Sequence, residues 1–248
     1  MGPLLKAEFI KARSTRATIG LVIGGATVAS LGAVSTIASG EVRDLTGGLH
    51  EQQYHLLASI NLGLFALIGG IRLFTDEFRH GTIVPTLLLA PDRRRVLAAK
   101  AITGASFGAL LVATAYAVMC LVAVVVLSTR GIDVGWSSAD VSAFAGITAA
   151  GALWGVIGVA VGATVRHQVA ATVGGVVWVL VVENLGTGFL GDIGPYLPGQ
   201  AAHALARVSA IGGGLLDPVV ASAVLLAYAL AAVATASTAL IRHDIAVA

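Results

Sequence analysis

Residues that could do chemistry are concentrated in one charged stretch, Asp76 to Lys100, which reads DEFRHGTIVPTLLLAPDRRRVLAAK. Apolar segments long enough to cross a bilayer flank it on both sides. Such a stretch could be a solvated loop that only orients the protein, or a docking site for a cytoplasmic partner. An orienting loop needs only basic residues, so the EFRHGT order and the apolar LLLAP favour docking.

Enzyme chemistry is not favoured by the pattern of titratable residues. The six histidines are scattered, and none is paired with a carboxylate at metal-ligand spacing inside an apolar segment. The chain also lacks G-x-x-x-x-G-K-[ST], so it has no phosphate-binding loop of that type. We expect no catalytic residue, cofactor or metal in this chain, and no nucleic-acid partner.

The composition indicates an all-α polytopic membrane protein. Hydrophobic residues make up 57% of the chain and charged residues 11%, whereas about 25% charged residues is usual in soluble domains. A bilayer core needs about 20 helical residues, so 248 residues allow six spans in one domain, 1–248. The six apolar segments are 18–38, 56–74, 96–127, 141–165, 169–182 and 219–241, of which the fifth is short unless it continues through Leu190.

The distribution of Lys and Arg predicts the orientation of these spans. Eleven of the 15 basic residues fall at the two termini and in the second and fourth loops, three fall in the other loops, and Arg72 falls inside the second span. Because basic residues resist translocation, both termini and the 76–100 stretch are expected in the cytosol. Arg72 lies near the cytosolic end of its span. It could extend to the interface, pair with Asp76, or bind an anionic substrate.

The charged stretch also predicts its own helix boundaries. Thr75 could cap a helix whose first turn holds Asp76 and Glu77, and Gly81 could end it. Pro85 prevents an unbroken continuation, and Asp92 could cap the third span. The prediction is a short cytoplasmic helix across the exit of the second span, within the loop 76–92.

The first 16 residues predict an amphipathic helix at the membrane interface. Leu4, Leu5, Phe9 and Ile10 share one helical face, whereas the basic residues lie largely on the others. A cleaved signal peptide is the alternative, although the apolar run is long for one and lacks an A-x-A site.

The segment 183–217 is too apolar for a freely solvated loop. Prolines and glycines break it into pieces, and residues 200–211 are good helix formers between two breakers. We expect a short re-entrant helix that dips into the outer leaflet and packs against other spans.

Several of these features together resemble one family. Glu77-x-x-x-Gly81-Thr82, followed by an apolar stretch and Pro91-x-Arg93, resembles the segment after the second span of ABC-2-type permeases, the membrane subunits of one class of ABC exporters. The basic N-terminal segment with Glu8 and Lys11, the six predicted spans and the LPGQAAHAL segment are similar to that family as well. The resemblance covers essentially the whole chain.

The resemblance implies a half-transporter in a bacterial cell membrane. It would dimerise with a second copy or a paralogue and dock on two ATP-binding subunits, which hold the ATP and Mg²⁺. The implied roles are coupling to the ATPase for Asp76, Glu77, Phe78, Arg79, Gly81 and Thr82, a connecting helix with Glu8 and Lys11, and an outer gate with Leu197, Pro198 and Gly199. A predicted midplane without acidic residues favours a hydrophobic or amphipathic cargo. A secondary transporter or channel remains the alternative, although no ionisable midplane residue or inverted repeat supports it.

Overall fold

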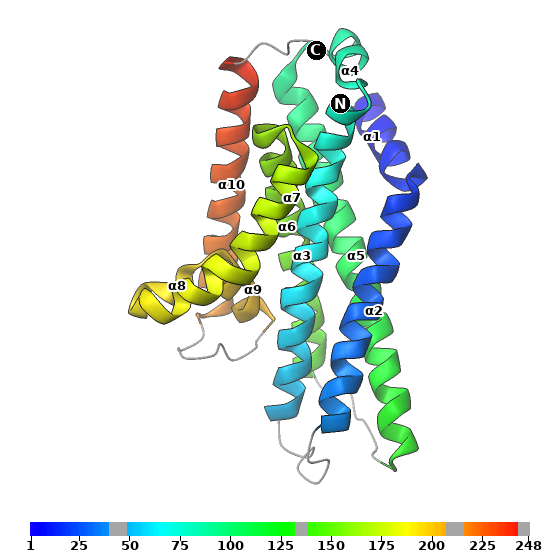
Figure 1. The fold of residues 1–248 in the computed structure, drawn as a ribbon, viewed down its shortest axis with the longest axis vertical. Helices are drawn as coiled ribbons and strands as arrows, with labels where there is room; N and C mark the ends of the chain where they lie inside the picture. The colour runs from blue at the N-terminus through cyan, green and yellow to red at the C-terminus, as the bar shows by residue number, and fades with distance from the viewer. Residues whose placement is uncertain (40–48, 132–137, 207–215, 243–248) are drawn as a thin grey trace.

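The computed structural model describes residues 1–39, 49–131, 138–206 and 216–242, and all its regular structure in these residues is helical (Figure 1). The α-helices are α1 (Gly2–Ser14), α2 (Arg16–Ser39), α3 (Leu49–Arg79), α4 (Ile83–Leu89), α5 (Arg93–Thr129), α6 (Ser138–Val165), α7 (Gln168–Val177), α8 (Glu183–Phe189), α9 (Pro198–Leu205) and α10 (Pro218–Arg242). A π-helical turn, η2 (Trp178–Val182), joins α7 to α8, and a 3-10 helix, η3 (Gly191–Tyr196), precedes α9.

Five described helical stretches are long and apolar enough to cross a membrane: Arg16–Ala38, Arg93–Thr129, Asp140–Val165, Gln168–Phe189 and Pro218–Arg242. They agree with five of the six predicted spans, and the other predicted span, 56–74, lies inside α3. The stretch Gln168–Phe189 reaches full length because α7, η2 and α8 form one continuous helical run. The chain is therefore a helical protein with the elements of a membrane protein.

Helix α6 lies at the centre of the bundle and packs against both α3 and α5. Glycines permit backbone contact on both sides. A Cβ on Gly155 would lie 2.1 Å from the Gly104 carbonyl oxygen of α5, and one on Gly158 would lie 2.2 Å from the Leu67 carbonyl oxygen of α3. The three helices are therefore tightly packed, and side chains at these glycine positions would separate them.

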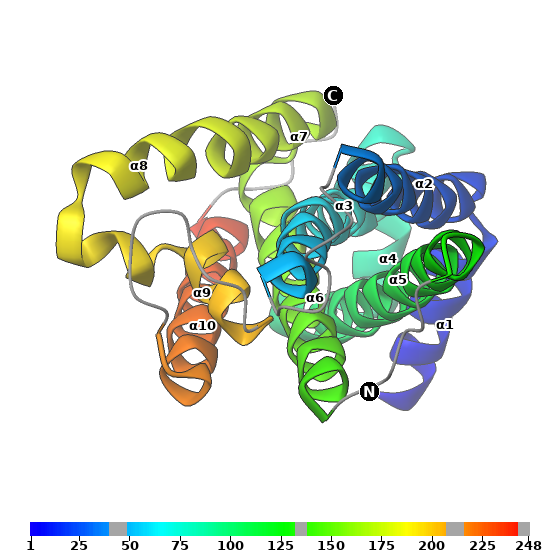
Figure 2. The ribbon, with the colours of Figure 1, turned by 90° about the horizontal axis from the view of Figure 1, so that it is seen from below.

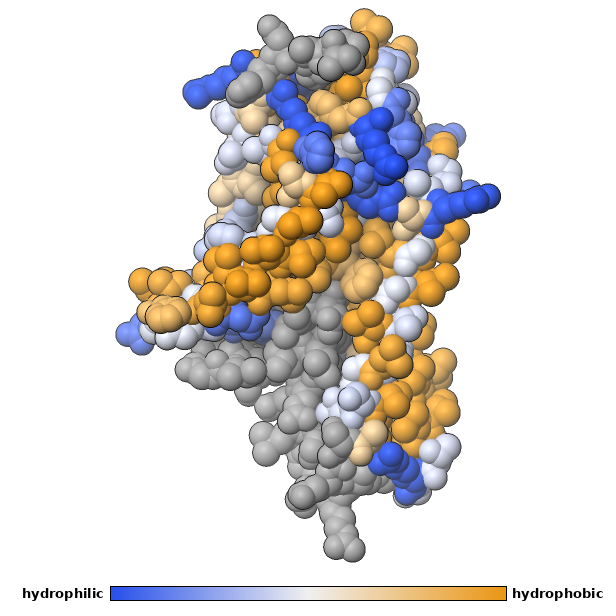
Figure 3. Space-filling view, viewed as in Figure 1, coloured by the Kyte–Doolittle hydropathy of each residue, from blue (hydrophilic) through white to orange (hydrophobic). Residues whose placement is uncertain are grey.

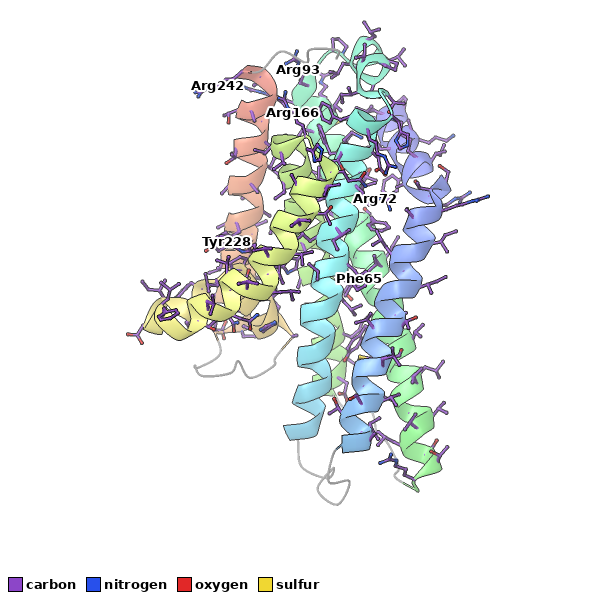
Figure 4. All side chains as sticks on the ribbon, in the orientation of Figure 1. Phe65, Arg72, Arg93, Arg166, Tyr228 and Arg242 are labelled. Atoms are coloured by element: carbon purple, nitrogen blue, oxygen red, sulfur yellow. The ribbon has the colours of Figure 1, made fainter. Side chains whose placement is uncertain are left out.

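Two outer layers complete the bundle. Helix α2 packs against α3 and α5, with Phe65 of α3 filling the space beside Gly24 and Gly25 (Figure 4). Helix α10 packs against α6 and α9 on the other side. The α7–η2–α8 run leaves the bundle on the side away from α1, so that α8 projects outward (Figure 2).

One end of the bundle brings together α1, α4 and the last turn of α10 (Figure 1). We call it the α4 end. The last turn of α10 is held there by two arginines, because Arg93 donates a hydrogen bond to the Leu240 carbonyl and Arg166 donates one of 2.9 Å to the Ala239 carbonyl. Cations at a helix C-terminus also interact favourably with the helix dipole. Figure 4 shows both arginines beside this end of α10.

The helix boundaries predicted around Thr75 are wrong. Helix α3 continues without a break to Arg79, and the Thr75 hydroxyl donates to the Ile71 carbonyl inside that helix instead of capping a new one. The short separate helix is α4, which contains Pro85 in its first turn, where a missing N–H is tolerated. The Asp92 cap is confirmed, since its carboxylate accepts from the backbone N–H groups of Arg94 and Arg95.

Candidate functional site

Four charged side chains from three helices meet at the α4 end and form what we call the charged cluster: Glu8, Lys11, Glu77 and Lys100. The Lys100 ammonium lies 2.7 Å from Glu8 Oε2 and 2.9 Å from Glu77 Oε1. Lys11 lies 3.0 Å from Glu8 Oε1 and 2.6 Å from Glu77 Oε1. Each glutamate therefore contacts both lysines, and the formal charges of the cluster cancel.

Three members of the cluster are almost completely buried. Glu8 and Lys100 are each 1% exposed and Glu77 is 4% exposed. Lys100 also donates to the Leu73 carbonyl at 3.0 Å and lies 5.6 Å from the centre of the Phe74 ring. Removing one partner from such a group would leave a buried charge unpaired, which costs several kcal/mol, about 3–5. The cluster thus ties α1 to α3 and α5.

Lys11 is the half-exposed member of the cluster and links it to α4. Its ammonium lies 3.4 Å from the hydroxyl oxygen of Thr86 on α4. Burial disfavours its charge, but the hydrogen bonds to Glu77 and Glu8 outweigh burial and raise the pKa of Lys11 above the ordinary 10.5. Lys11 therefore stays cationic at neutral pH and connects α1 to both ends of the α3–α4 turn.

The turn from α3 to α4 has the geometry that the sequence EFRHGT requires. The Thr82 N–H donates to the Glu77 carbonyl at 2.9 Å and the Gly81 N–H to the Phe78 carbonyl at 3.3 Å. These two bonds define a Schellman motif, whose C′ residue needs a positive φ. Gly81 supplies it with φ +65°. The motif directs α4 across the end of α3, as predicted for a short helix in this loop.

Helix α4 buries one face and leaves the other without a partner in the described chain. Ile83 and Thr86 are buried, whereas Leu88 is 79% exposed and Leu89 is 89% exposed. These two leucines form the apolar tip of α4. Leu89 is nearly as exposed as an isolated side chain would be.

The other residues predicted to couple to an ATPase lie around the cluster but do not belong to it. Asp76 pairs with Arg72 at 3.1 Å, which confirms one of the predicted interactions of Arg72. Phe78 stacks on Phe74, and Arg79 donates to the Gln168 side chain at 3.2 Å. Thr82 caps α4 as its N-cap residue without a side-chain hydrogen bond to the helix.

A second buried charge lies far from the cluster in sequence, at the start of α8. Glu183 is 3% exposed, and its Oε1 accepts a hydrogen bond of 3.0 Å from the Trp178 indole N–H. The π-helical turn makes this contact possible, because it aligns residues five positions apart and its backbone bonds Glu183 N–H to the Trp178 carbonyl. Glu183 lies within the helical stretch Gln168–Phe189, on the α8 side of its centre, and so inside the fifth predicted span where that span continues past Val182.

One of the predicted gate residues, Gly199, lies against Glu183. The Gly199 backbone N–H donates to the Glu183 carboxylate. A Cβ on Gly199 would lie only 1.8 Å from Glu183 Oε2, so glycine is required for this approach. Pro198 begins α9 at the position where proline is favoured, and Leu197 precedes it as the N-cap.

Glu183, Gly199, Gln200 and His203 line a small pocket, together with Trp154 and Asn184, and we call it the α9 pocket. Burial lowers the pKa of His203 to about 4, so that its imidazole is neutral at neutral pH. No hydrogen-bond partner of the His203 ring is found among the described residues. A short helix, α9, is present in this segment and ends at Leu205. The rest of the helix predicted over 200–211 falls largely on residues 207–215, which lie outside the described chain, and its re-entry into the membrane stays a prediction.

Sequence reasoning missed Lys100 of the charged cluster, Thr86 beside it, and Glu183 and His203 of the α9 pocket. Lys100 had a visible signal, since it lies inside the predicted span 96–127 and an intramembrane charge indicates a function or a partner. Glu183 gives no such signal, because the predicted apolar segment 169–182 ends just before it.

The described part of the chain contains no group of three or more His, Cys, Asp or Glu residues that could hold a metal ion. No model of a known protein family matches the chain, and no curated protein matches its sequence.

Proposed function

We propose that the chain is the membrane-spanning subunit of an ABC exporter of the ABC-2 type, with the ATPase on a separate subunit. The observation that carries the proposal is the apolar tip of α4 held in place by the charged cluster. Leu88 and Leu89 are exposed at the end of a short helix whose base is fixed through Thr86, Lys11 and Glu77. Such a helix suits docking on a cytoplasmic protein.

The mechanism follows from the connections of α4. Two copies of the chain enclose the cargo path, and each α4 tip sits in a groove of an ATP-binding subunit. When ATP draws these subunits together, the α4 tips move with them. The cluster passes the displacement to α1, α3 and α5 as one unit, because each of its glutamates bonds two lysines. The cargo is proposed to be hydrophobic or amphipathic.

A site-specific cross-link tests the proposed docking. A photo-reactive amino acid at Leu89 is expected to capture a P-loop ATPase when the chain is expressed in its native host. The same amino acid at Leu110 is the matched control, since Leu110 is 65% exposed on the middle of α5. The purified complex should hydrolyse ATP, and Leu89→Asp should reduce recovery of the ATPase at least tenfold with normal membrane insertion. Equal recovery of the ATPase with the native chain and with Leu89→Asp would contradict the docking role of α4.

An ion-coupled secondary transporter is the second candidate, and Glu183 is the observation that favours it. A buried carboxylate within a span is a usual site for proton coupling. Transport by the purified chain alone in proteoliposomes, driven by a proton gradient and lost in Glu183→Gln, would favour this candidate. The exporter proposal expects transport only with the ATPase and ATP.

A further inference from the structure

Glu183 is buried, but unlike the glutamates of the charged cluster it has no cationic partner in the described chain. Its two hydrogen bonds come from neutral donors, the Trp178 indole and the Gly199 backbone. Both are donated to the side chain, so that its oxygens act as acceptors, as those of a carboxylate do. A buried carboxylate without a cation is a costly arrangement, and a ligand that brings a positive charge would relieve it.

The other groups around the α9 pocket are suited to a nitrogen cation. The side chains of Gln200 and His203 line it, and both an amide oxygen and a neutral imidazole nitrogen accept hydrogen bonds. His203 is 8% exposed and its ring has no partner among the described residues. Trp154 contributes an aromatic ring, which attracts cations. The lining thus offers acceptors to a cation, although the amides of Gln200 and Asn184, the Trp154 indole and the His203 ring can also donate.

The pocket is small, with a cavity volume of about 30 Å³. A metal ion is less suitable than a nitrogen cation, because among the described residues only Glu183 and His203 could bind it strongly and no third such ligand is near.

The surface beside the pocket is apolar. Residues of η2 and α8 on either side of Glu183 are exposed and hydrophobic, among them Leu180, Val181, Val182 and Leu185. Figure 3 shows this apolar surface as a continuous orange area along α7 and α8. An alkyl chain could lie along it while its head group enters the pocket.

We propose that the α9 pocket binds the ammonium group of an amphipathic primary amine, with Glu183 as the counter-charge. The amine can be a free amphiphile or the head group of an aminophospholipid, which present the same chemistry. Binding needs no ATPase, so it holds independently of the proposed function. Only the further step, that the amine is the cargo, rests on that function.

A titration of the purified chain in phosphatidylcholine nanodiscs tests this binding. Dodecylamine is added, tryptophan fluorescence is followed, and empty nanodiscs provide the blank. We expect saturable binding that Glu183→Gln weakens at least tenfold, because the amide has the shape of the carboxylate without its charge. Asp192→Asn, which removes an exposed carboxylate from neighbouring η3, is the matched control and should bind as the native chain does.

1-Dodecanol provides the second control, since it has the same alkyl chain without the charge. Equal affinity for dodecanol and dodecylamine, or equal affinity of Glu183→Gln and the native chain for dodecylamine, would overturn the proposal. Where binding depends on Glu183, replacing part of the lipid by phosphatidylethanolamine identifies the source. If dodecylamine binds more weakly in nanodiscs with phosphatidylethanolamine than in pure phosphatidylcholine, the lipid head group competes for the pocket and the site is assigned to it. If the affinity for dodecylamine is unchanged, the site is assigned to the free amine.

Discussion

Glu77 and Glu183 are both buried glutamates at a junction of helices, but their surroundings differ. Glu77 lies within 3 Å of two lysines that also contact Glu8. Glu183 accepts only from an indole and a backbone N–H among the described residues. The lysines compensate the glutamates of the first site within the chain, whereas Glu183 has no cationic partner among the described residues.

The difference separates a structural site from a binding site. In the charged cluster every buried charge is compensated, so the cluster holds three helices and α4 in one arrangement. In the α9 pocket Glu183 accepts hydrogen bonds from η2 and α9, but no described cation compensates it. Variants that remove one charge at each site should therefore have opposite consequences for stability and binding.

The largest loss of stability is expected for Lys100→Met. The substitution leaves Glu8 and Glu77 buried with only the half-exposed Lys11, and breaking a buried pair costs about 3–5 kcal/mol. Thermal unfolding in nanodiscs, followed by circular dichroism, should show a clearly lower midpoint than for Lys6→Met, which removes an exposed lysine of α1. Equal midpoints for the two variants would mean that the cluster does not hold the helices.

Gly199→Ala should disrupt the α9 pocket and spare the cluster. The new methyl group would lie 1.8 Å from Glu183 Oε2, so α9 or Glu183 must move, and such overpacking costs about 1–3 kcal/mol. Gly174→Ala on α7 is the control, since its Cβ would meet nothing within 4 Å. The same unfolding measurement should show a loss for the first variant only. A native midpoint for Gly199→Ala would contradict the close contact.

Lys11→Met should have a smaller effect, because Lys11 is half exposed and water screens its ion pairs, which leaves about 1 kcal/mol. The effect should depend on pH. The folded pKa is raised above 10.5, so the stabilisation is full below pH 10.5 and is lost as the pH rises through the higher folded pKa. The unfolding midpoints of the native chain and of Lys11→Met should therefore converge as the pH rises above 10.5. A difference between the midpoints that does not change with pH would argue against the ion pairs.

Glu183→Gln should have the smallest effect on stability, within about 1 kcal/mol, because the amide oxygen can still accept from Trp178. The same unfolding measurement checks it beside Lys100→Met. A loss as large as that of Lys100→Met would show that Glu183 has a cationic partner, and the contrast between the two sites would then disappear.

The spans and the turn at Gly81 could be predicted from the sequence because their signals are local. Apolar length predicts a span, and Gly81 followed by Thr82 predicts the end of a helix with a positive φ at the glycine. Asp92 before three arginines likewise predicted the start of α5. The error at Thr75 arose because two acidic residues suggested a new helix, whereas the hydrophobic contacts of Phe74 and Phe78 favour one continuous helix.

The two sites could be predicted only in part, because their residues come together from distant segments. Glu8 and Lys100 are 92 residues apart in the chain, and no local pattern pairs them. The α9 pocket needs a π-helical turn between Trp178 and Val182, for which apolar periodicity gives no sign. Of the α9 pocket, only Gly199 was singled out in the sequence. The reason that glycine is required there, the close approach of Glu183, depends on the fold.

The glycine contacts of α6 restrict how the protein can change shape. On one side Gly155 meets the backbone of Gly104, and on the other Gly158 meets the backbone of Leu67. If α6 slid along either neighbour by one residue, side chains such as Trp154 or Ile157 would take the place of these glycines and force the backbones apart. Helices α3, α5 and α6 therefore move as one rigid body. A change in shape is therefore expected where α2, α7–α8 or α10 meets this body.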